Sequence, residues 1–405
     1  MRLSSLLLAT TTLLPAAALA APPVIGGMSS PAGMWPDTAA VLFPSGNQDL
    51  QACTGTLIAP TVVITAGHCT TASDPPLPDN VLIGTDALDH PERGEMLHIK
   101  QVIEYPNSQQ TIDVGVLVLD TASKIAPRAI ATGWARLDIQ NAAMIEIVGF
   151  GTIDANATMS VNELQQAATT ITDFDCASKP GCNAAAKPDG ELGAGGGGVD
   201  TCPGDSGGPL YLLTGYGSFL AGVTSRAYDN ATQQCGEGGI YERPDKVVPW
   251  IEQMTGVAVT HGPEPALDAP LEVMGVDGAE ASITANDPKS TAHGFAIKTP
   301  PAHGSANVRA DGRLRACSDG GGTGSDSVTV TVTDTMDATR AVDMTYPITV
   351  TDPTGAATCD AAAFDDGSGG GGCCDAGRSA GGSLPLALGV LAILGRRRQI
   401  RRSGR

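Results

Sequence analysis

The sequence predicts an all-β protein, and three observations support this fold class. Short apolar and β-branched runs recur along the chain, for example at 39–43, 114–119 and 144–148. Turn-forming residues separate them, and the chain holds 51 glycines and 28 prolines. One segment, 246–254, has a helical pattern and is followed by a Thr-Gly stop, while the glycine-rich stretch 188–198 is expected to be a loop. Many short strands separated by turns are typical of β-barrels and β-sandwiches.

Length and composition limit the classes of protein to be considered. A chain of 405 residues with 42% hydrophobic residues is long enough for two cores, so we expect two domains with additional segments at the ends. The formal net charge of −19 argues against a nucleic-acid partner, because binding a phosphate backbone requires a basic surface. Ten cysteines are more than a reducing cytosol favours.

The N-terminus indicates export. Arg2 precedes an apolar run from Leu3 to Leu14, and small residues follow at Ala18 and Ala20. The run is short of the ~20 apolar residues that span a bilayer, so a signal peptide over 1–20 is favoured over a membrane anchor. We therefore expect a secreted protein in which disulfide bonds are plausible.

A second strand-rich region extends over 261–352. Alternating residues at 327–333 and 346–350 are typical of half-buried strands. With the Pro-Pro-Ala-His-Gly turn that ends at Gly304, this region resembles the immunoglobulin-like repeats of bacterial surface proteins. The resemblance implies a β-sandwich, followed by a Gly/Cys-rich linker over 353–383.

The C-terminal segment, 384–405, begins with an apolar run and ends in arginines. Eleven mostly apolar residues, 384–394, rise only ~16 Å as a helix, which is too short to span a bilayer alone. Cys373 and Cys374 precede the run, and the order of cysteines, apolar run and arginines resembles the MYXO-CTERM sorting signal of myxobacteria. The resemblance implies a transient contact with a membrane or sorting machinery; a weak interfacial anchor is the alternative.

Three segments have the composition of a nucleophilic active site. Ser206 lies in Cys-Pro-Gly-Asp-Ser-Gly-Gly-Pro, where glycines allow backbone N–H groups to converge on one point. His68 lies in Thr-Ala-Gly-His-Cys and has the side chain best suited to general-base work near neutral pH. Asp113 opens an apolar strand, where a carboxylate can orient an imidazole, whereas its rival Asp120 follows that strand.

Together these segments resemble the trypsin/chymotrypsin family of serine peptidases. The order His68, Asp113, Ser206 is that of the family, and the resemblance covers 24–256. It implies two six-stranded antiparallel β-barrels with a short C-terminal helix, and hydrolysis of peptide bonds in protein or peptide substrates. It also implies an oxyanion hole formed by the N–H groups of Gly204 and Ser206.

The resemblance implies disulfide pairs as well. It pairs Cys53 with Cys69 around the histidine loop and Cys202 with Cys235 across the specificity pocket. Cys176 and Cys182 are close enough in sequence for a small loop. The remaining candidates are Cys317 and Cys359, although sequence alone does not fix connectivity.

The resemblance implies that substrate preference depends on Asp200, six residues before Ser206. In trypsin-like members a carboxylate at this position lies at the base of the pocket, which implies cleavage after arginine or lysine. Ser225 and Gly239 match pocket-wall positions of the family. Two residues depart from it: Arg226 replaces a usual tryptophan, and Ala227 replaces a usual glycine. Arg226 is therefore a candidate to compete for Asp200 or to repel basic substrates, and Ala227 to narrow the entrance.

Val24-Ile25-Gly26-Gly27 resembles the mature N-terminus of the family. The resemblance implies that the freed amine of Val24 pairs with Asp205 and shapes the oxyanion hole. Pro23 replaces the usual lysine or arginine before the cleavage site, and only the propeptide 21–23 remains after signal cleavage. We therefore expect an activating peptidase that tolerates proline.

One alternative function remains open at the level of sequence. The chain could be a non-catalytic surface protein that uses the protease fold and the β-sandwich for binding or adhesion. No cluster has metal-ligand spacing in the second region, so no metal or cofactor is expected.

Overall fold

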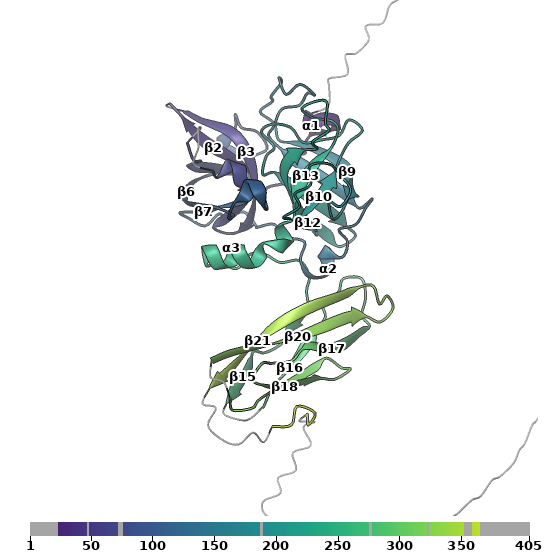
Figure 1. Cartoon of the computed structure of the whole chain (residues 1–405). Helices are drawn as coiled ribbons and strands as arrows, with labels where there is room; N and C mark the ends of the chain where they lie inside the picture. Colours follow the sequence, from purple (N-terminus) through teal and green to yellow (C-terminus); the bar gives the residue numbers. More distant parts are fainter. Residues whose placement is uncertain are drawn as a thin grey trace, which may run out of the picture. The chain divides into compact units, whose positions relative to one another are not determined.

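The computed structural model describes residues 23–46, 48–71, 76–186, 189–274, 278–321, 324–351 and 359–364 (Figure 1). The expected signal peptide, the first two propeptide residues, and the expected sorting tail with Cys373 and Cys374 lie outside the described residues. Within the part that is described, no helix is long and apolar enough to cross a membrane.

The first six-stranded barrel encloses an apolar core. Its strands close in the order β2-β3-β4-β7-β6-β5, and Figure 1 colours them purple to blue. The core includes Val41, Leu57, Val63 and Leu117, which are all buried. The strands are β2 (Thr38–Ser45), β3 (Gln48–Ala59), β4 (Val62–Ala66), β5 (Asn80–Ile83), β6 (Glu95–Glu104) and β7 (Val114–Leu119).

The second barrel has the same number of strands and also closes on itself, because β8 pairs with both β9 and β11. The short β1 (Met28–Ser29) adds to the outside of β9. Two six-stranded barrels are therefore confirmed. The strands are β8 (Met144–Gly149), β9 (Gln165–Asp173), β10 (Glu191–Ala194), β11 (Pro209–Thr214), β12 (Gly217–Ala227) and β13 (Gly239–Glu242).

The expectation of an uninterrupted loop over 188–198 was wrong. Strand β10 occupies 191–194, where it pairs with β13 and β9. All four of its residues are buried. Pairing on both sides and burial outweigh the weak strand propensity of the glycines around it.

Few residues form helices. The C-terminal helix α3 (Val248–Thr255) begins two residues later than 246, because Pro244–Lys246 form the 3-10 turn η4. Helix α3 ends at Gly256, whose φ of 68° lets its N–H reach the Glu252 carbonyl at 2.8 Å. The other helices are α1 (Pro23–Gly26) and α2 (Gly133–Arg136), and the other 3-10 turns are η1 (Gly67–Cys69), η2 (Pro91–Arg93) and η3 (Ser108–Gln110).

The region after the barrels is a β-sandwich of two four-stranded sheets, ordered β14-β16-β19-β18 and β15-β21-β20-β17. Its core follows the alternation in the sequence, since Val328, Val330 and Val332 of β20 are all buried. The strands are β14 (Ala266–Leu267), β15 (Leu271–Met274), β16 (Gly278–Thr284), β17 (His293–Thr299), β18 (Gly304–Val308), β19 (Arg313–Ser318), β20 (Gly324–Asp334) and β21 (Ala341–Thr351).

Candidate active site

Two neighbouring strands of the first barrel bring His68 and Asp113 together. In the register of β4 and β7, Ala66 lies opposite Val114. The residues that follow β4 therefore meet the residue that precedes β7. Asp113 accepts hydrogen bonds from the backbone N–H of His68 at Oδ1 and lies against the imidazole Nδ1 at Oδ2, both at 2.8 Å. Two contacts between one carboxylate and one residue fix the orientation of the imidazole ring.

Asp113 is buried but ionised. Burial opposes ionisation, yet the hydrogen bonds from His68 and Ser225 lower the pKa of this carboxyl below its ordinary value. Ser225 Oγ donates to Asp113 Oδ2 at 2.7 Å. The sequence placed Ser225 only in the pocket wall and missed this contact. The signal in the sequence that could have indicated this contact was a small hydroxyl residue at the end of the mostly apolar run 219–225. This run is buried in β12.

Ser206 reaches the first barrel through its backbone, because its carbonyl accepts the N–H of Thr54 in β3 at 2.8 Å. The next residue permits this approach. Gly207 has φ +81°, and an added Cβ would lie 2.1 Å from Thr65 Oγ1 and 2.4 Å from the Thr54 carbonyl. Only glycine fits here. The loop that carries Ser206 thereby lies against β3 and β4, the latter of which leads into His68.

Two carbonyl groups around Ser206 have partners that indicate how the neighbouring N–H groups point. The Pro203 carbonyl accepts the N–H of Thr152 at 2.9 Å, and the Asp205 carbonyl accepts that of Gly208 at 2.7 Å. In a trans peptide the N–H points opposite to the C=O. The N–H groups of Gly204 and Ser206 therefore point away from Thr152 and Gly208, the residues that these two carbonyls contact.

A cavity of about 240 Å³ adjoins Ser206. Asp200, Ser225, Arg226 and Ala227 are among the residues that line it. Asp200 is 2% exposed. Its carboxylate accepts the N–H groups of Thr201 at 2.9 Å, Gly236 at 2.9 Å and Gly238 at 3.0 Å. Burial raises the pKa of Asp200 to about 6 despite these donors.

Arg226 and Ala227, which differ from the residues usual in the resembled family, have different surroundings. The guanidinium of Arg226 contacts Glu191 and Glu242, not Asp200. Ala227 does line the cavity, as its position in sequence implied. A Cβ on Gly239 would lie 2.9 Å from the Arg226 carbonyl oxygen, so the close approach of β12 favours glycine at this position.

Val24 and Asp205 are both buried, with 1% and 0% exposure. Asp205 accepts the N–H groups of Gly151 at 2.7 Å and Cys202 at 2.9 Å. No cation pairs with it among the residues described here. Burial raises the pKa of Asp205 to about 7, so near neutral pH this carboxyl exchanges between its neutral and charged forms.

Disulfide bonds form in both barrels and at the β-sandwich. The bonded pairs are Cys53–Cys69, Cys176–Cys182, Cys202–Cys235 and Cys317–Cys359. Two groups bring possible metal ligands together, Cys53 with His68 and Cys69, and Cys176 with Cys182 and Glu191. The cysteines of both groups are disulfide-bonded, and a disulfide sulfur lacks the thiolate charge of a metal ligand.

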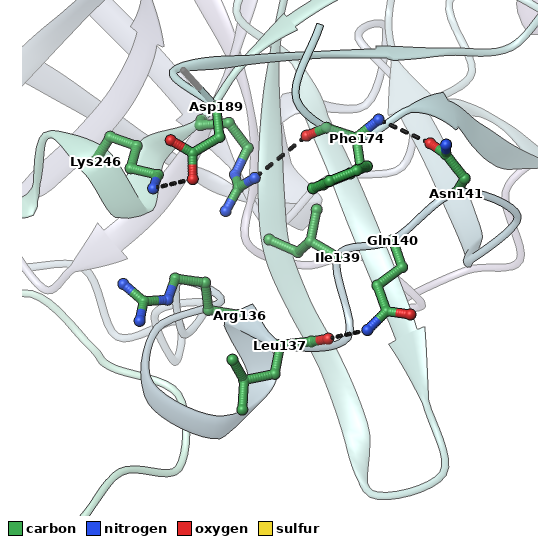
Figure 2. Close-up of a pocket in the computed structure, with 9 residues that line it drawn as sticks. Arg136, Leu137, Ile139, Gln140, Asn141, Phe174, Asp189 and Lys246 are labelled. Atoms are coloured by element: carbon green, nitrogen blue, oxygen red, sulfur yellow. Dashed lines mark hydrogen bonds and ion pairs between the residues drawn. The ribbon is translucent and has the colours of Figure 1, made fainter. Parts of the chain in front are cut away.

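A larger cavity of about 670 Å³ lies elsewhere on the second barrel (Figure 2). Its basic side chains are partly engaged, since Lys246 pairs with Asp189 at 2.5 Å and the Phe174 carbonyl accepts from Arg243 at 3.4 Å. None of His68, Asp113 or Ser206 lines it. Size alone therefore does not identify the reactive site, and the smaller cavity beside Ser206 is the candidate.

Residues 24–251 match the family model for trypsin, which is more than half of the chain. The chain belongs to the trypsin family. Residues 264–346 match the model for a bacterial Ig domain, which accounts for the β-sandwich. Family membership establishes a trypsin-like serine protease fold over the barrels that carry the His68–Asp113 pair.

Two curated relatives cover most of the same region. A protein named "Trypsin" from Saccharopolyspora erythraea is 32% identical over 229 residues, which is 54% of this chain and 92% of the relative. A protein named "Glucanase inhibitor protein 3" from Phytophthora infestans is 28% identical over 242 residues, or 57% of this chain and 88% of the relative. The similarity to "Trypsin" supports a trypsin-like hydrolase at the level of the family.

Proposed function

We propose that this chain is a secreted serine endopeptidase that cleaves peptide bonds after arginine or lysine. The observation that carries the proposal is the His68–Asp113 pair, joined by two 2.8 Å contacts, in a chain whose Ser206 lines a cavity containing buried Asp200. Ser206 is the nucleophile, His68 the general base, and Asp113 the group that orients the imidazole and stabilises its charged form.

The reaction proceeds through an acyl-enzyme. Ser206 Oγ attacks the scissile carbonyl carbon while His68 takes the hydroxyl proton. The oxyanion receives hydrogen bonds from the N–H groups of Gly204 and Ser206, which stabilise the transition state by several kcal/mol. His68 then gives its proton to the leaving amine, and a water molecule activated by His68 hydrolyses the ester.

Asp200 supplies the preference for basic residues. Its burial makes an unpaired charge costly, and a bound guanidinium or ammonium group would relieve that cost. Arg226 does not neutralise Asp200, since its own partners are Glu191 and Glu242. Ala227 narrows the pocket by one methyl group relative to glycine, which favours a slender side chain.

Activity requires release of Val24. The new amine pairs with Asp205, whose burial leaves it in need of a counter-charge. Pro23 precedes the bond to be cut, so self-activation by cleavage after arginine or lysine does not occur and another peptidase removes 21–23. The signal peptide over 1–20 exports the chain, and the tail over 384–405 acts as a sorting signal.

A second function is suggested by the relative that is named as a glucanase inhibitor. In that case the protease fold and the sandwich would bind a partner without hydrolysing it. A non-catalytic protein has no need of a base, yet the His68–Asp113 contacts are complete in this chain. This observation favours the peptidase.

Chromogenic peptides ending in arginine, phenylalanine or alanine test the proposal on the chain processed to begin at Val24. We expect kcat/KM to be highest for the arginine peptide. A preference for phenylalanine would contradict the specificity, and absence of hydrolysis in the processed chain would favour the binding function.

A further inference from the structure

Arg226 holds a buried acidic pair behind the catalytic aspartate. It lies at the end of β12, beside Ser225, and its side chain is 35% exposed. Nη2 donates to Glu191 Oε1 at 2.6 Å, and Nη1 donates to Glu242 Oε1 at 3.2 Å. The side chains of both acids are almost inaccessible, with 1% and 0% exposure. A cation that bridges two buried carboxylates is held firmly in place.

The same guanidinium is connected to the triad through one hydroxyl. Arg226 Nη1 donates to Ser225 Oγ at 3.0 Å, and Ser225 Oγ donates to Asp113 Oδ2 at 2.7 Å. A guanidinium only donates hydrogen bonds, and a hydroxyl has a single proton. Ser225 must therefore accept from Arg226 and give its proton to Asp113. The direction of the chain from Arg226 to Asp113 is fixed.

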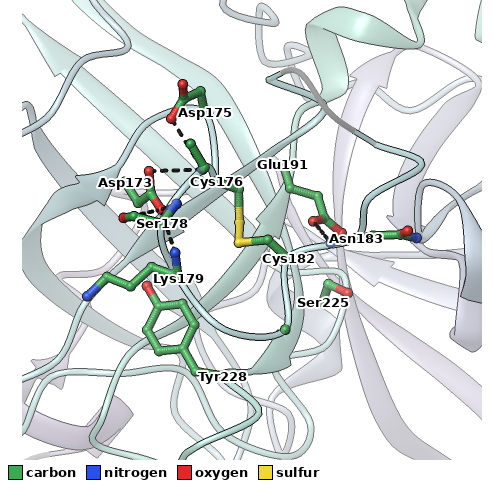
Figure 3. The surroundings of a disulfide bond; sticks show 12 residues. Asp173, Asp175, Cys176, Ser178, Lys179, Cys182, Asn183, Glu191, Ser225 and Tyr228 are labelled. Carbon is green, nitrogen blue, oxygen red and sulfur yellow. Dashed lines mark hydrogen bonds between the residues drawn. A yellow bond between two sulfur atoms is a disulfide. The ribbon is translucent and has the colours of Figure 1, made fainter.

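Glu191 is the main counter-charge of Arg226. Its second oxygen, Oε2, accepts the N–H of Asn183 at 2.6 Å (Figure 3). Glu242 Oε2 has no hydrogen-bond partner among the described residues. Burial, and then the charge of Glu191, raise the pKa of Glu242 well above its ordinary value. Glu242 therefore binds a proton more readily than an exposed carboxyl does, and Glu191 makes the shorter contact with Arg226, 2.6 Å against 3.2 Å.

We propose that Arg226 and Glu191 are positioning residues that set the proton affinity of His68 through Ser225 and Asp113. Arg226 strengthens the Ser225 hydrogen bond to Asp113 and offsets part of its negative charge, which makes His68 easier to deprotonate. Glu191 opposes this by offsetting the charge of Arg226. The titratable or charged groups that face Arg226 are Glu191 from β10, Glu242 from β13 and Asp113 before β7.

This inference rests on His68 acting as the base of the proposed peptidase, but its first test does not require turnover. We would follow the titration of His68 by NMR in the processed Ser206→Ala protein. Removing the positive charge with Arg226→Met is expected to raise the pKa of His68 by about half a unit, and removing the negative charge with Glu191→Gln to lower it by a similar amount. Opposite shifts distinguish an electrostatic role from general loosening of the fold.

Two controls keep the test decisive. Arg226→Lys keeps the positive charge, so His68 in this variant is expected to titrate close to its wild-type pH. If Arg226→Met does not fold, the comparison of Arg226→Lys with Glu191→Gln decides the question. Arg128 forms a partly buried pair with Asp37 outside this network, so Arg128→Met is expected to lower stability without moving the titration. Shifts in one direction for both charge-removing variants, or no shift in Glu191→Gln, would overturn the proposal.

In the chain with Ser206 intact, the acid limb of the kcat/KM profile should move in the same directions as the His68 titration. A wild type that hydrolyses no peptide contradicts the proposed function, while the NMR shifts still decide the role of Arg226. An active wild type whose variants keep the same profile contradicts only the role of Arg226 and Glu191.

Discussion

The two barrels share a strand number and a closed topology but differ in what they bury. In the described part of the first barrel, the buried charged side chains are Asp37 and Asp113, and its other buried side chains are apolar or uncharged, such as Thr54 and Thr65. The second barrel buries many more, namely Glu146, Asp173, Glu191, Asp200, Asp205, Glu242 and Arg243. Burying a charge is costly unless it is paired or used.

The difference indicates a division of labour. The first barrel holds His68 and Asp113, the proposed base and its orienting carboxylate, at one edge of a largely apolar core. The second barrel concentrates buried carboxylates: Glu191 pairs with Arg226, and in the proposed function Asp200 receives a substrate cation and Asp205 the amine of Val24. Substitutions in the two barrels should therefore change different properties of the protein, and the following predictions are ordered by their expected effect on hydrolysis.

The largest effect is expected at the edge of the first barrel. Asp113→Asn should lower kcat by roughly 10⁴-fold, because the amide favours the wrong tautomer of His68. The measurement is steady-state hydrolysis of the arginine peptide by the processed chain. Asp120→Asn is the matched control, since Asp120 is half exposed and lies 3.9 Å from His98. Equal losses in the two variants would rule out Asp113 as the orienting group.

In the second barrel, Asp200→Ser should remove the preference for basic residues. We expect kcat/KM for the arginine peptide to fall roughly 10²- to 10³-fold, because a buried charge pair is lost, with little change for the alanine peptide. The ratio of the two kcat/KM values is the quantity to measure. The exposed Asp229 provides a control in Asp229→Ser. A parallel loss for both peptides would contradict a role in specificity.

Asp205 should make the unprocessed chain sensitive to pH. Its folded pKa, raised to about 7, lies above the unfolded value, so its contribution to stability is complete below pH ~4 and is lost as the pH rises through 7. Denaturant unfolding between pH 4 and 8 measures the change, which we expect to be on the order of a few kcal/mol.

Asp205→Asn is the control for this pH dependence and should flatten it. Processing to Val24 should also flatten it, because the amine then compensates the charge. An unchanged pH dependence in Asp205→Asn would show that other groups are responsible.

The smallest effect on hydrolysis is expected in the apolar core of the first barrel. Leu57 is fully buried there, so Leu57→Ala should lower the free energy of unfolding by about 2–5 kcal/mol. The KM for the arginine peptide and the position of the acid limb should stay at wild-type values below the unfolding transition. A shift in the acid limb of the kcat/KM profile would contradict the proposed difference between the two barrels.

The sequence predicted what depends on local pattern and missed what depends on pairing between distant strands. Alternation located β20, and the position of Asp113 directly before an apolar run predicted a carboxylate at the mouth of β7. Strand β10 was missed because its partners, β9 and β13, are remote in sequence and its own composition is typical of a loop.

The partners of Arg226 were missed for the same reason. Sequence suggested competition for Asp200, yet Glu191 and Glu242 lie 35 and 16 residues from Arg226 along the chain. Each is a single carboxylate in a strand of four residues, where no spacing distinguishes it from a solvent-facing side chain. Only the register of β10, β12 and β13 brings the three residues together.

The most direct test of the account is labelling with an arginine-directed active-site phosphonate, which reacts only with a nucleophile activated beside a pocket for a basic side chain. The chain processed to Val24 should be labelled, whereas Ser206→Ala and the unprocessed chain should not. Labelling of Ser206→Ala, or no labelling of the processed wild type, would contradict the assignment of Ser206, His68 and Asp113 as a working triad.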